Sequence, residues 1–166
     1  MRFKNNNKKT KLMSRAKFLT MLALMFSSCS GVTRLDSDDF TDVDSRIDIL
    51  EKEVRVFSEI HDAEFELFNV NGFQSQRQGF TIPGASSGDY KFVVKVDTAD
   101  IKKWTEGMVK LDLNHDDDSW TKEIVSARAE HWKTTCEPSY YGRQGDDVEL
   151  VLFRENGIIF KRIIIN

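Results

Sequence analysis

The alternation of apolar and polar residues from residue 63 onwards predicts strands. Residues 63–70 and 90–96 each alternate with a period of two, which is typical of a strand with one buried face. A short strand is also predicted at 80–82, ended by Pro83, which lacks the amide hydrogen that a central strand needs. The inward positions of the two longer strands are Phe65, Leu67, Tyr90, Phe92, Val94 and Val96.

The C-terminus has the pattern of a hairpin. Two apolar runs, 148–153 and 158–165, are separated by four residues that end in Asn156-Gly157. This dipeptide favours the positive backbone dihedrals of a tight turn. We therefore expect the last two strands to pair directly.

Two further segments have the period of helices. Apolar residues, among them Trp104 and Trp120, recur at helical spacing over 98–108 and 119–130. An order of strands, helices and strands is typical of an α+β domain with an antiparallel sheet. We expect residues 63–166 to form such a domain, with both helices on one face of the sheet and the hairpin at its C-terminus.

A separate amphipathic stripe precedes this domain. Within residues 40–60, apolar side chains recur at spacings of three and four, which predicts a helix over about 41–60. This is the heptad pattern of a coiled coil, sustained for about two and a half heptads. Two interpretations stay open: a stalk that supports weak homo-oligomers, or a helix that packs on the protein's own sheet. The stripe consists of Phe40, Val43, Ile47, Leu50, Val54 and Phe57.

The first 28 residues have the charge pattern of a secretory signal. Seven cations and no acid lie within 1–28, and a nine-residue apolar run occupies 18–26. A helix needs roughly 20 apolar residues to span a bilayer, so this run predicts a cleaved or processed signal rather than a membrane span. A start at Met13 would leave a shorter signal, and export is expected from either start.

Phe26-Ser27-Ser28-Cys29 resembles the lipobox of bacterial lipoproteins, although Phe26 replaces the usual Leu. The resemblance implies that Cys29 is diacylated and becomes the mature N-terminus, so that acyl chains such as palmitate anchor the protein to a membrane. Two or three acyl chains give stable anchoring, which a single chain does not. Ser30 in place of Asp after the cysteine implies the outer membrane, with the domain facing the periplasm or the cell surface.

Residues 29–39 are polar and acidic, and we expect a flexible tether there. The order of cysteine, acidic stretch and short amphipathic helix is similar to the membrane-proximal part of Bacteroidota-type surface lipoproteins. This resemblance covers about 30 residues and implies surface exposure.

Residues 112–123 have the spacing of an EF-hand calcium loop. Oxygen-bearing side chains occupy positions 1, 3, 5 and 7, and a glutamate occupies position 12. Asp117 replaces the usual glycine and Ser119 the usual aliphatic residue, so the match is partial. The alternative is an acidic loop in which Asp118 or Ser119 caps the following helix. The candidate Ca²⁺ ligands are Asp112, Asn114, Asp116, Asp118 and Glu123.

Few other residues indicate chemistry. Cys136 and His131 are five residues apart, but no signature of a cysteine hydrolase surrounds them, and no catalytic residue is predicted. Tyr140 and Tyr141 are candidates for a ligand surface toward a sugar or peptide, whereas the tryptophans of the helices are expected in the core.

Composition and charge narrow the function. The chain has 166 residues, 40% of them hydrophobic, which is enough for one domain, and its two cysteines exclude a disulfide-rich scaffold. The net charge is −3 and residues 1–28 contribute +7, so residues 29–166 carry −10, which disfavours nucleic acid as a partner. We expect a non-enzymatic envelope lipoprotein that presents its domain to an envelope protein, a glycan or a toxin. The alternatives are a calcium-binding module, or an immunity-type or hydrolytic envelope protein.

Overall fold

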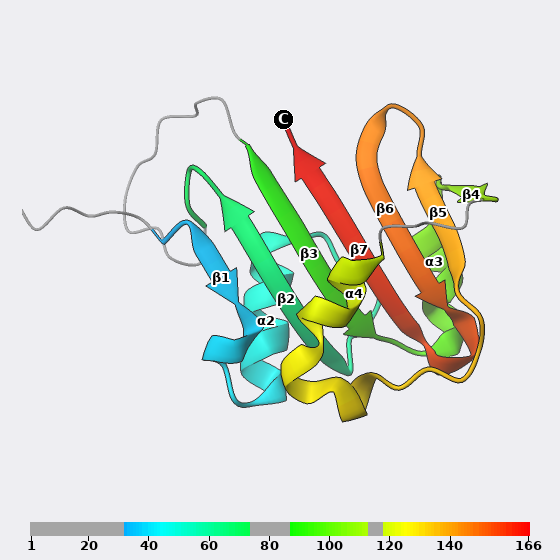
Figure 1. Ribbon diagram of the computed structural model, residues 1–166, viewed down its shortest axis with the longest axis horizontal. Helices are drawn as coiled ribbons and strands as arrows, with labels where there is room; N and C mark the ends of the chain where they lie inside the picture. The colour runs from blue at the N-terminus through cyan, green and yellow to red at the C-terminus, as the bar shows by residue number, and fades with distance from the viewer. Residues whose placement is uncertain (1–31, 74–86, 113–117) are drawn as a thin grey trace, which may run out of the picture. The chain divides into compact units, whose positions relative to one another are not determined.

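Seven strands form one antiparallel sheet in the computed structural model, which describes residues 32–73, 87–112 and 118–166. The strand order is β1-β2-β3-β7-β6-β5-β4 (Figure 1). These strands and a few helices confirm the predicted α+β class. The strands are β1 (Arg34–Asp36), β2 (Asp62–Asn69), β3 (Gly88–Lys95), β4 (Val109–Leu111), β5 (Ser139–Arg143), β6 (Asp146–Phe153) and β7 (Ile158–Ile165).

The four long strands follow the hydrophobic alternation of the sequence. β2, β3, β6 and β7 have eight residues each and lie within two residues of their predicted bounds. The strand predicted at 80–82 lies outside the described residues. The sequence did not reveal β1, β4 and β5, which have only three, three and five residues and so offer little alternation to detect.

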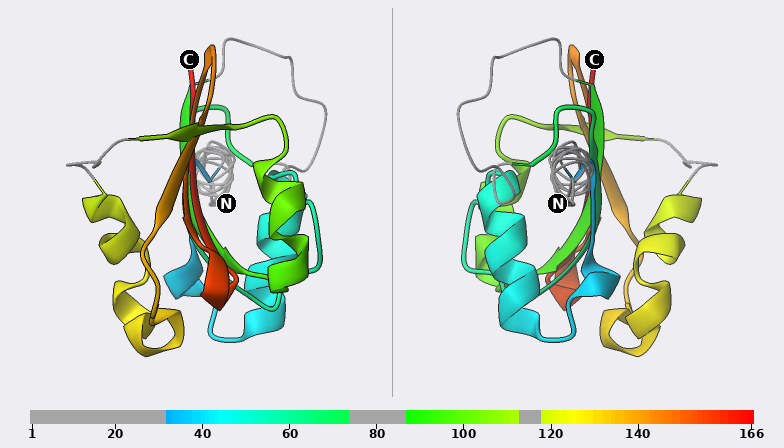
Figure 2. Two further views of the ribbon diagram at one scale, coloured as in Figure 1. Left: turned by 90° about the vertical axis from the view of Figure 1, so that its right-hand side faces the viewer. Right: turned by 90° about the vertical axis from the view of Figure 1, so that its left-hand side faces the viewer.

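Helices cover both faces of the sheet (Figure 2). α2 (Val43–Glu53) and α3 (Ile101–Thr105), the latter preceded by η4 (Thr98–Asp100), lie on one face. α4 (Ser119–Ile124) and η5 (Ser126–Trp132) lie on the other.

The prediction that both domain helices share one face is therefore wrong. Phe92, Val93 and Val94 follow one another on β3 and are all fully buried. Because successive side chains of a strand point to opposite faces, such a run requires apolar cover on both sides. α3 supplies cover on the side of Phe92, and α4 supplies it on the side of Val93.

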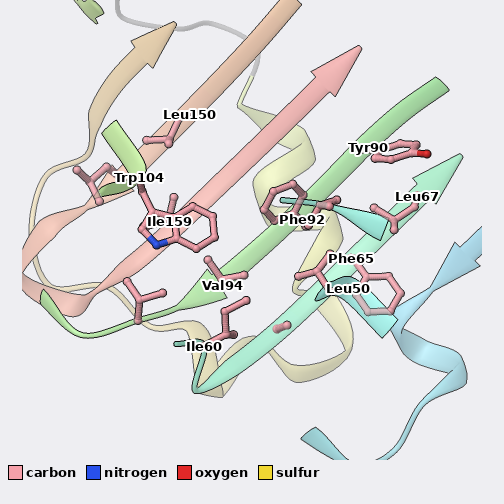
Figure 3. Packing of buried hydrophobic residues seen from close by; sticks show 14 of the residues in the cluster. Leu50, Ile60, Phe65, Leu67, Tyr90, Phe92, Val94, Trp104, Leu150 and Ile159 are labelled. Atoms are coloured by element: carbon pink, nitrogen blue, oxygen red, sulfur yellow. The ribbon is translucent and has the colours of Figure 1, made fainter. Parts of the chain in front are cut away.

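The larger core lies between the sheet and the helices α2 and α3 (Figure 3). Trp104 of α3 packs there and donates its indole hydrogen to Ser58 Oγ at 2.9 Å. Leu50 of α2 is fully buried in the same core. All six inward positions predicted from the alternation, Phe65 and Phe92 among them, belong to this cluster.

The amphipathic stripe of residues 40–60 therefore packs on the protein's own sheet, and the stalk interpretation is wrong. The helix is also shorter than predicted. The Asp42 side chain caps its N-terminus by accepting a hydrogen bond from Ser45 N at 2.8 Å. The helix ends at Glu53, and the backbone of Val54 is extended. Leu50 and Val54 are buried within the chain, so this part of the stripe belongs to the protein's own core. Weak self-association through residues 40–60 stays a prediction.

The segment predicted as a tether is partly built into the sheet. β1 pairs with β2, with Leu35 opposite Leu67, and Leu35 is buried. η2 (Ser37–Asp39) then leads toward α2. The sequence did not predict this strand because only Leu35 of its three residues is apolar.

The C-terminal hairpin is confirmed, but its turn differs in detail. η6 (Arg154–Asn156) connects β6 to β7, and only Gly157 has a positive φ, of 63°. A Cβ atom at Gly157 would lie 2.2 Å from the Val96 carbonyl oxygen. Glycine is therefore needed at this position both for the backbone conformation and for the close approach of the neighbouring segment.

No helix in the described ranges is long and apolar enough to cross a membrane.

Candidate ligand-binding cleft

A cleft of about 720 Å³ opens beside the C-terminal half of β7. Its walls come from the segment that follows α2, from the end of α3, from the turn between β5 and β6, and from the last residues of β7. We call this the Lys161 cleft. Its principal lining residues are Arg55, Phe57, Arg143, Asp146, Lys161 and Ile163.

Lys161 occupies a core position of the sheet. It lies on β7 directly between Phe92 of β3 and Leu150 of β6, both of which are fully buried. Alternation places it on the same face as Ile159 and Ile163, toward the larger core. The residue is only 5% exposed, so little of its side chain meets water, and it lines the open cleft.

No carboxylate of the described residues pairs with this amine. Its recorded contact is with Phe57, where Nζ lies over the ring at 5.0 Å from the centroid. Arg55 Cζ lies over the same ring at 5.2 Å. A cation–π contact contributes about 0.5–2 kcal/mol, and it leaves the positive charge of the amine uncompensated.

The surroundings lower the pKa of Lys161 from 10.5 to about 8. Burial is the largest cause, and the positive charges of Arg143 and Arg55 add to it. Both causes disfavour the ammonium form. The side chain is nevertheless still mostly protonated at pH 7, so the cleft holds a desolvated cation that lacks a counterion within the described chain.

The rim of the cleft carries opposed charges that are partly paired. Arg143 Nη1 lies 3.5 Å from Asp146 Oδ2, and Asn166 Nδ2 donates to Asp147 Oδ2 at 2.8 Å. Glu106 also lines the cleft and is exposed. Asp146 is thus engaged by Arg143, and the acids of the rim are not among the groups that influence the Lys161 pKa.

The sequence carries one signal that points to Lys161. The last strand is almost entirely apolar, and a lysine at an inward position of such a strand is unusual because buried lysines are rare unless paired. Its neighbours Arg55 and Phe57 come from a distant, irregular segment, so sequence alone gives no indication that they meet Lys161.

The proposed calcium ligands are only partly described. Asn114 and Asp116 lie outside the described residues. Asp112 and Glu123 are exposed, and Asp118 precedes α4 without a side-chain capping bond. Among the described residues, no group of three or more His, Cys, Asp or Glu side chains is placed to hold a metal ion. Calcium binding at this loop stays a prediction.

The helix cap proposed as the alternative differs from what the structure shows for Asp118. Its backbone carbonyl, rather than its carboxylate, accepts from Thr121, at 2.9 Å from N and 2.7 Å from Oγ1. The first turn of α4 is therefore closed by main-chain and threonine bonds.

Cys136 and His131 have different partners. The Cys136 thiol donates to Asn156 Oδ1 at 3.4 Å, next to the turn between β6 and β7. His131 Nδ1 lies 3.8 Å from Asp62 Oδ2. These contacts give neither residue the arrangement of a nucleophile with its base.

Tyr140 and Tyr141 do not share a surface. They are consecutive on β5 and therefore point to opposite faces. Tyr140 packs against the smaller cluster around Trp120, and Tyr141 packs against the larger core. The two tyrosines therefore do not form one surface, and a ligand role for either stays a prediction. The prediction that the tryptophans of the helices are core residues is confirmed, since Trp104, Trp120 and Trp132 are all buried.

A second set of buried charges, the salt-bridge cluster, is internally satisfied. Arg128 from η5 binds both oxygens of Glu64, at 2.5 and 2.6 Å. Arg46 of α2 binds Asp62 Oδ1 and the Ala63 carbonyl, each at 2.8 Å. Burial raises the pKa of Glu64, but the hydrogen bonds it accepts and the two arginines outweigh burial, so that its pKa is lowered overall. The cluster ties helices from both faces to β2 and offers no free group to a ligand.

The chain matches no known family model, no curated protein sequence and no solved structure. The function is therefore inferred from the Lys161 cleft and from the N-terminal sequence.

Proposed function

We propose that the protein is an exported, lipid-anchored envelope protein whose domain binds a small ligand in the Lys161 cleft. The observation that carries the binding role is Lys161 itself. The residue is almost completely buried, lines an open cleft, and its amine lacks an anionic partner among the described residues. A buried charge without a partner costs stability, and such costs are concentrated at functional sites.

The size and lining of the cleft also favour ligand binding. Small-molecule sites typically enclose about 300–1,000 Å³ and combine apolar walls with a few polar groups that orient the ligand. Here Phe57 and Ile163 supply apolar wall, and Lys161 supplies the polar group. The described lining contains neither His nor Cys, and we propose binding without catalysis.

The anchor is proposed from the sequence. Acylation at Cys29 would hold the protein on the outer membrane, and Ser30 favours that membrane over the inner one. The domain would then face the periplasm or the cell surface. There, the ligand would be part of an envelope protein, a glycan or a toxin. A Cys29→Ala variant should lose incorporation of labelled palmitate and leave the membrane fraction. If the variant is still labelled, the anchor is not at Cys29.

The cleft can be tested on the full chain in a nonionic detergent. Isoleucine methyl groups labelled with ¹³C report on the cleft through Ile163 and Ile165. Ile124, which packs against the smaller cluster around Trp120, serves as a reference on the opposite face. A panel of small carboxylates, amides, amines and sugars should shift the methyl signals of Ile163 and Ile165. Shifts confined to Ile124, or the absence of any shift, would contradict the proposal.

A further inference from the structure

We propose that the Lys161 cleft takes a small organic monocarboxylate, whose carboxylate pairs with the Lys161 ammonium while its apolar part lies against Phe57 and Ile163. This inference rests on the proposed function and specifies the chemistry of the ligand. Three features of the cleft support it: the position of the amine, the charges around the cleft and the apolar wall.

The position of the amine favours an anion. Lys161 Nζ lies over the Phe57 ring, and the cations Arg55 and Arg143 line the same cleft. Arg55 forms no ion pair with the described residues, whereas Arg143 is engaged by Asp146. An incoming anion would thus meet two uncompensated cations and would relieve the repulsion between them. A cationic ligand would add to that repulsion.

The charge balance favours a single negative charge. Arg55, Arg143 and Lys161 line the cleft together with Glu106, Asp146 and Asp147, so the lining carries three cations and three acids. A phosphate dianion would bring two charges close to these acids. A carboxylate brings one charge, which the Lys161 ammonium balances.

The apolar wall favours an organic body attached to that carboxylate. Phe57, Ile163 and Ile165 are half-buried residues that pack against the larger core and also line the cleft. Their exposed parts face the same cleft as the amine, and the Phe57 ring is in contact with it. A hydrated inorganic anion would gain nothing from this wall, whereas an aromatic or aliphatic group would remove it from water.

The experiment compares 4-phenylbutanoate with its neutral counterpart 4-phenylbutanamide and with inorganic phosphate. Each is titrated at pH 7 into the full chain in a nonionic detergent, and the ¹³C-methyl signals of Ile163 and Ile165 are followed. The carboxylate should bind at least about tenfold more tightly than the amide, because only the carboxylate brings a negative charge to the hydrogen bond with the ammonium. Phosphate should bind more weakly than 4-phenylbutanoate.

Two variants assign this preference to the amine. Lys161→Met should abolish the difference in affinity between the carboxylate and the amide. The methyl spectrum of the variant should remain that of a folded protein. Lys102→Met serves as the matched control, because Lys102 is exposed on α3 and does not line this cleft, so the preference should be unchanged.

The outcomes separate the two proposals. If the amide shifts Ile163 and Ile165 as readily as the carboxylate, the monocarboxylate inference is overturned and the ligand cleft stands. If phosphate binds more tightly, or if the preference survives Lys161→Met, the monocarboxylate inference is likewise overturned. If no probe shifts these methyl groups, both the inference and the proposed binding function are contradicted.

Discussion

Lys161 Nζ lies over the face of the Phe57 ring, 5.0 Å from its centroid. The two residues come from distant parts of the chain, one from the last strand and the other from the segment that follows α2. Arg55 lies over the same ring, so one aromatic side chain is in contact with two cations. This arrangement keeps a charged amine inside the apolar face of the sheet without neutralising it.

Replacing Lys161 should stabilise the protein. Methionine has a similar length, fits the surroundings of Phe92 and Leu150, and carries no charge that has to be desolvated. Since the pKa of Lys161 is lowered from 10.5 to about 8, Lys161→Met should raise the free energy of unfolding at pH 7 by up to about 3 kcal/mol. Urea denaturation of both proteins measures the difference. A loss of stability would show that the amine is paired in the folded state.

The same lowered pKa should make stability depend on pH at alkaline values. Below pH 8 Lys161 is protonated in both the folded and the unfolded state, so the full cost of the buried charge is present. Between about pH 8 and 10.5 the unfolded state binds more protons than the folded state, and the free energy of unfolding rises with pH.

The difference between the wild type and Lys161→Met isolates this effect, because Tyr140, whose pKa is raised mainly by burial, titrates in both proteins. The groups that line the cleft with Lys161, namely Arg55, Glu106, Arg143, Asp146 and Asp147, are likewise common to both. The stability difference should shrink from pH 8 to pH 10.5. A difference that is constant over this range would refute the assignment.

Breaking the salt-bridge cluster should be costly. Arg128→Met leaves the carboxylate of Glu64, which is 1% exposed, without its closest partner. Loss of one partner from a buried ion pair costs about 3–5 kcal/mol. Arg34→Met provides the comparison, because Arg34 is 60% exposed and a surface ion pair contributes at most about 1 kcal/mol. Equal effects of the two substitutions on chemical denaturation would show that Glu64 is solvated.

Gly157 should tolerate alanine much less well than Gly107 does. Both have positive φ, of 63° and 73°, so both substitutions strain the backbone by about 1–2 kcal/mol. Only at Gly157 would the new Cβ meet a backbone atom, the Val96 carbonyl oxygen at 2.2 Å, whereas Gly107 has open space. The steric clash should add about 1–3 kcal/mol to the loss of stability at Gly157, measured by thermal unfolding. Equal losses would mean that the turn shifts freely away from Val96.

The sequence predicted those parts of the fold in which local pattern and tertiary packing agree. The long strands β2, β3, β6 and β7 were found because each repeats its alternation over several residues. The short strands β1 and β4 were missed because three residues define no period, and their pairing is fixed by neighbours in space.

The candidate site was harder to predict for a related reason. Lys161 is close to Phe57 only after the segment between α2 and β2 folds over β7, and this contact has no local signature in the sequence. Tyr140 and Tyr141 attracted attention as adjacent aromatics, but adjacency on a strand separates side chains onto opposite faces. Adjacency in the sequence was therefore misleading for the two tyrosines. Lys161 and Phe57, which do meet in the cleft, are far apart in the sequence.

Titration of Lys161 itself shows whether its amine is buried and unpaired in the free protein. With ¹³C-labelled lysine in the full chain, the Cε signal that disappears in Lys161→Met belongs to this residue, and its shift with pH gives the pKa. We predict a midpoint of about 8 in the free protein, and a higher midpoint in the presence of 4-phenylbutanoate, because a bound carboxylate favours the ammonium form. A midpoint near 10.5 that does not change with the carboxylate would contradict both the buried, unpaired amine and its role in the cleft.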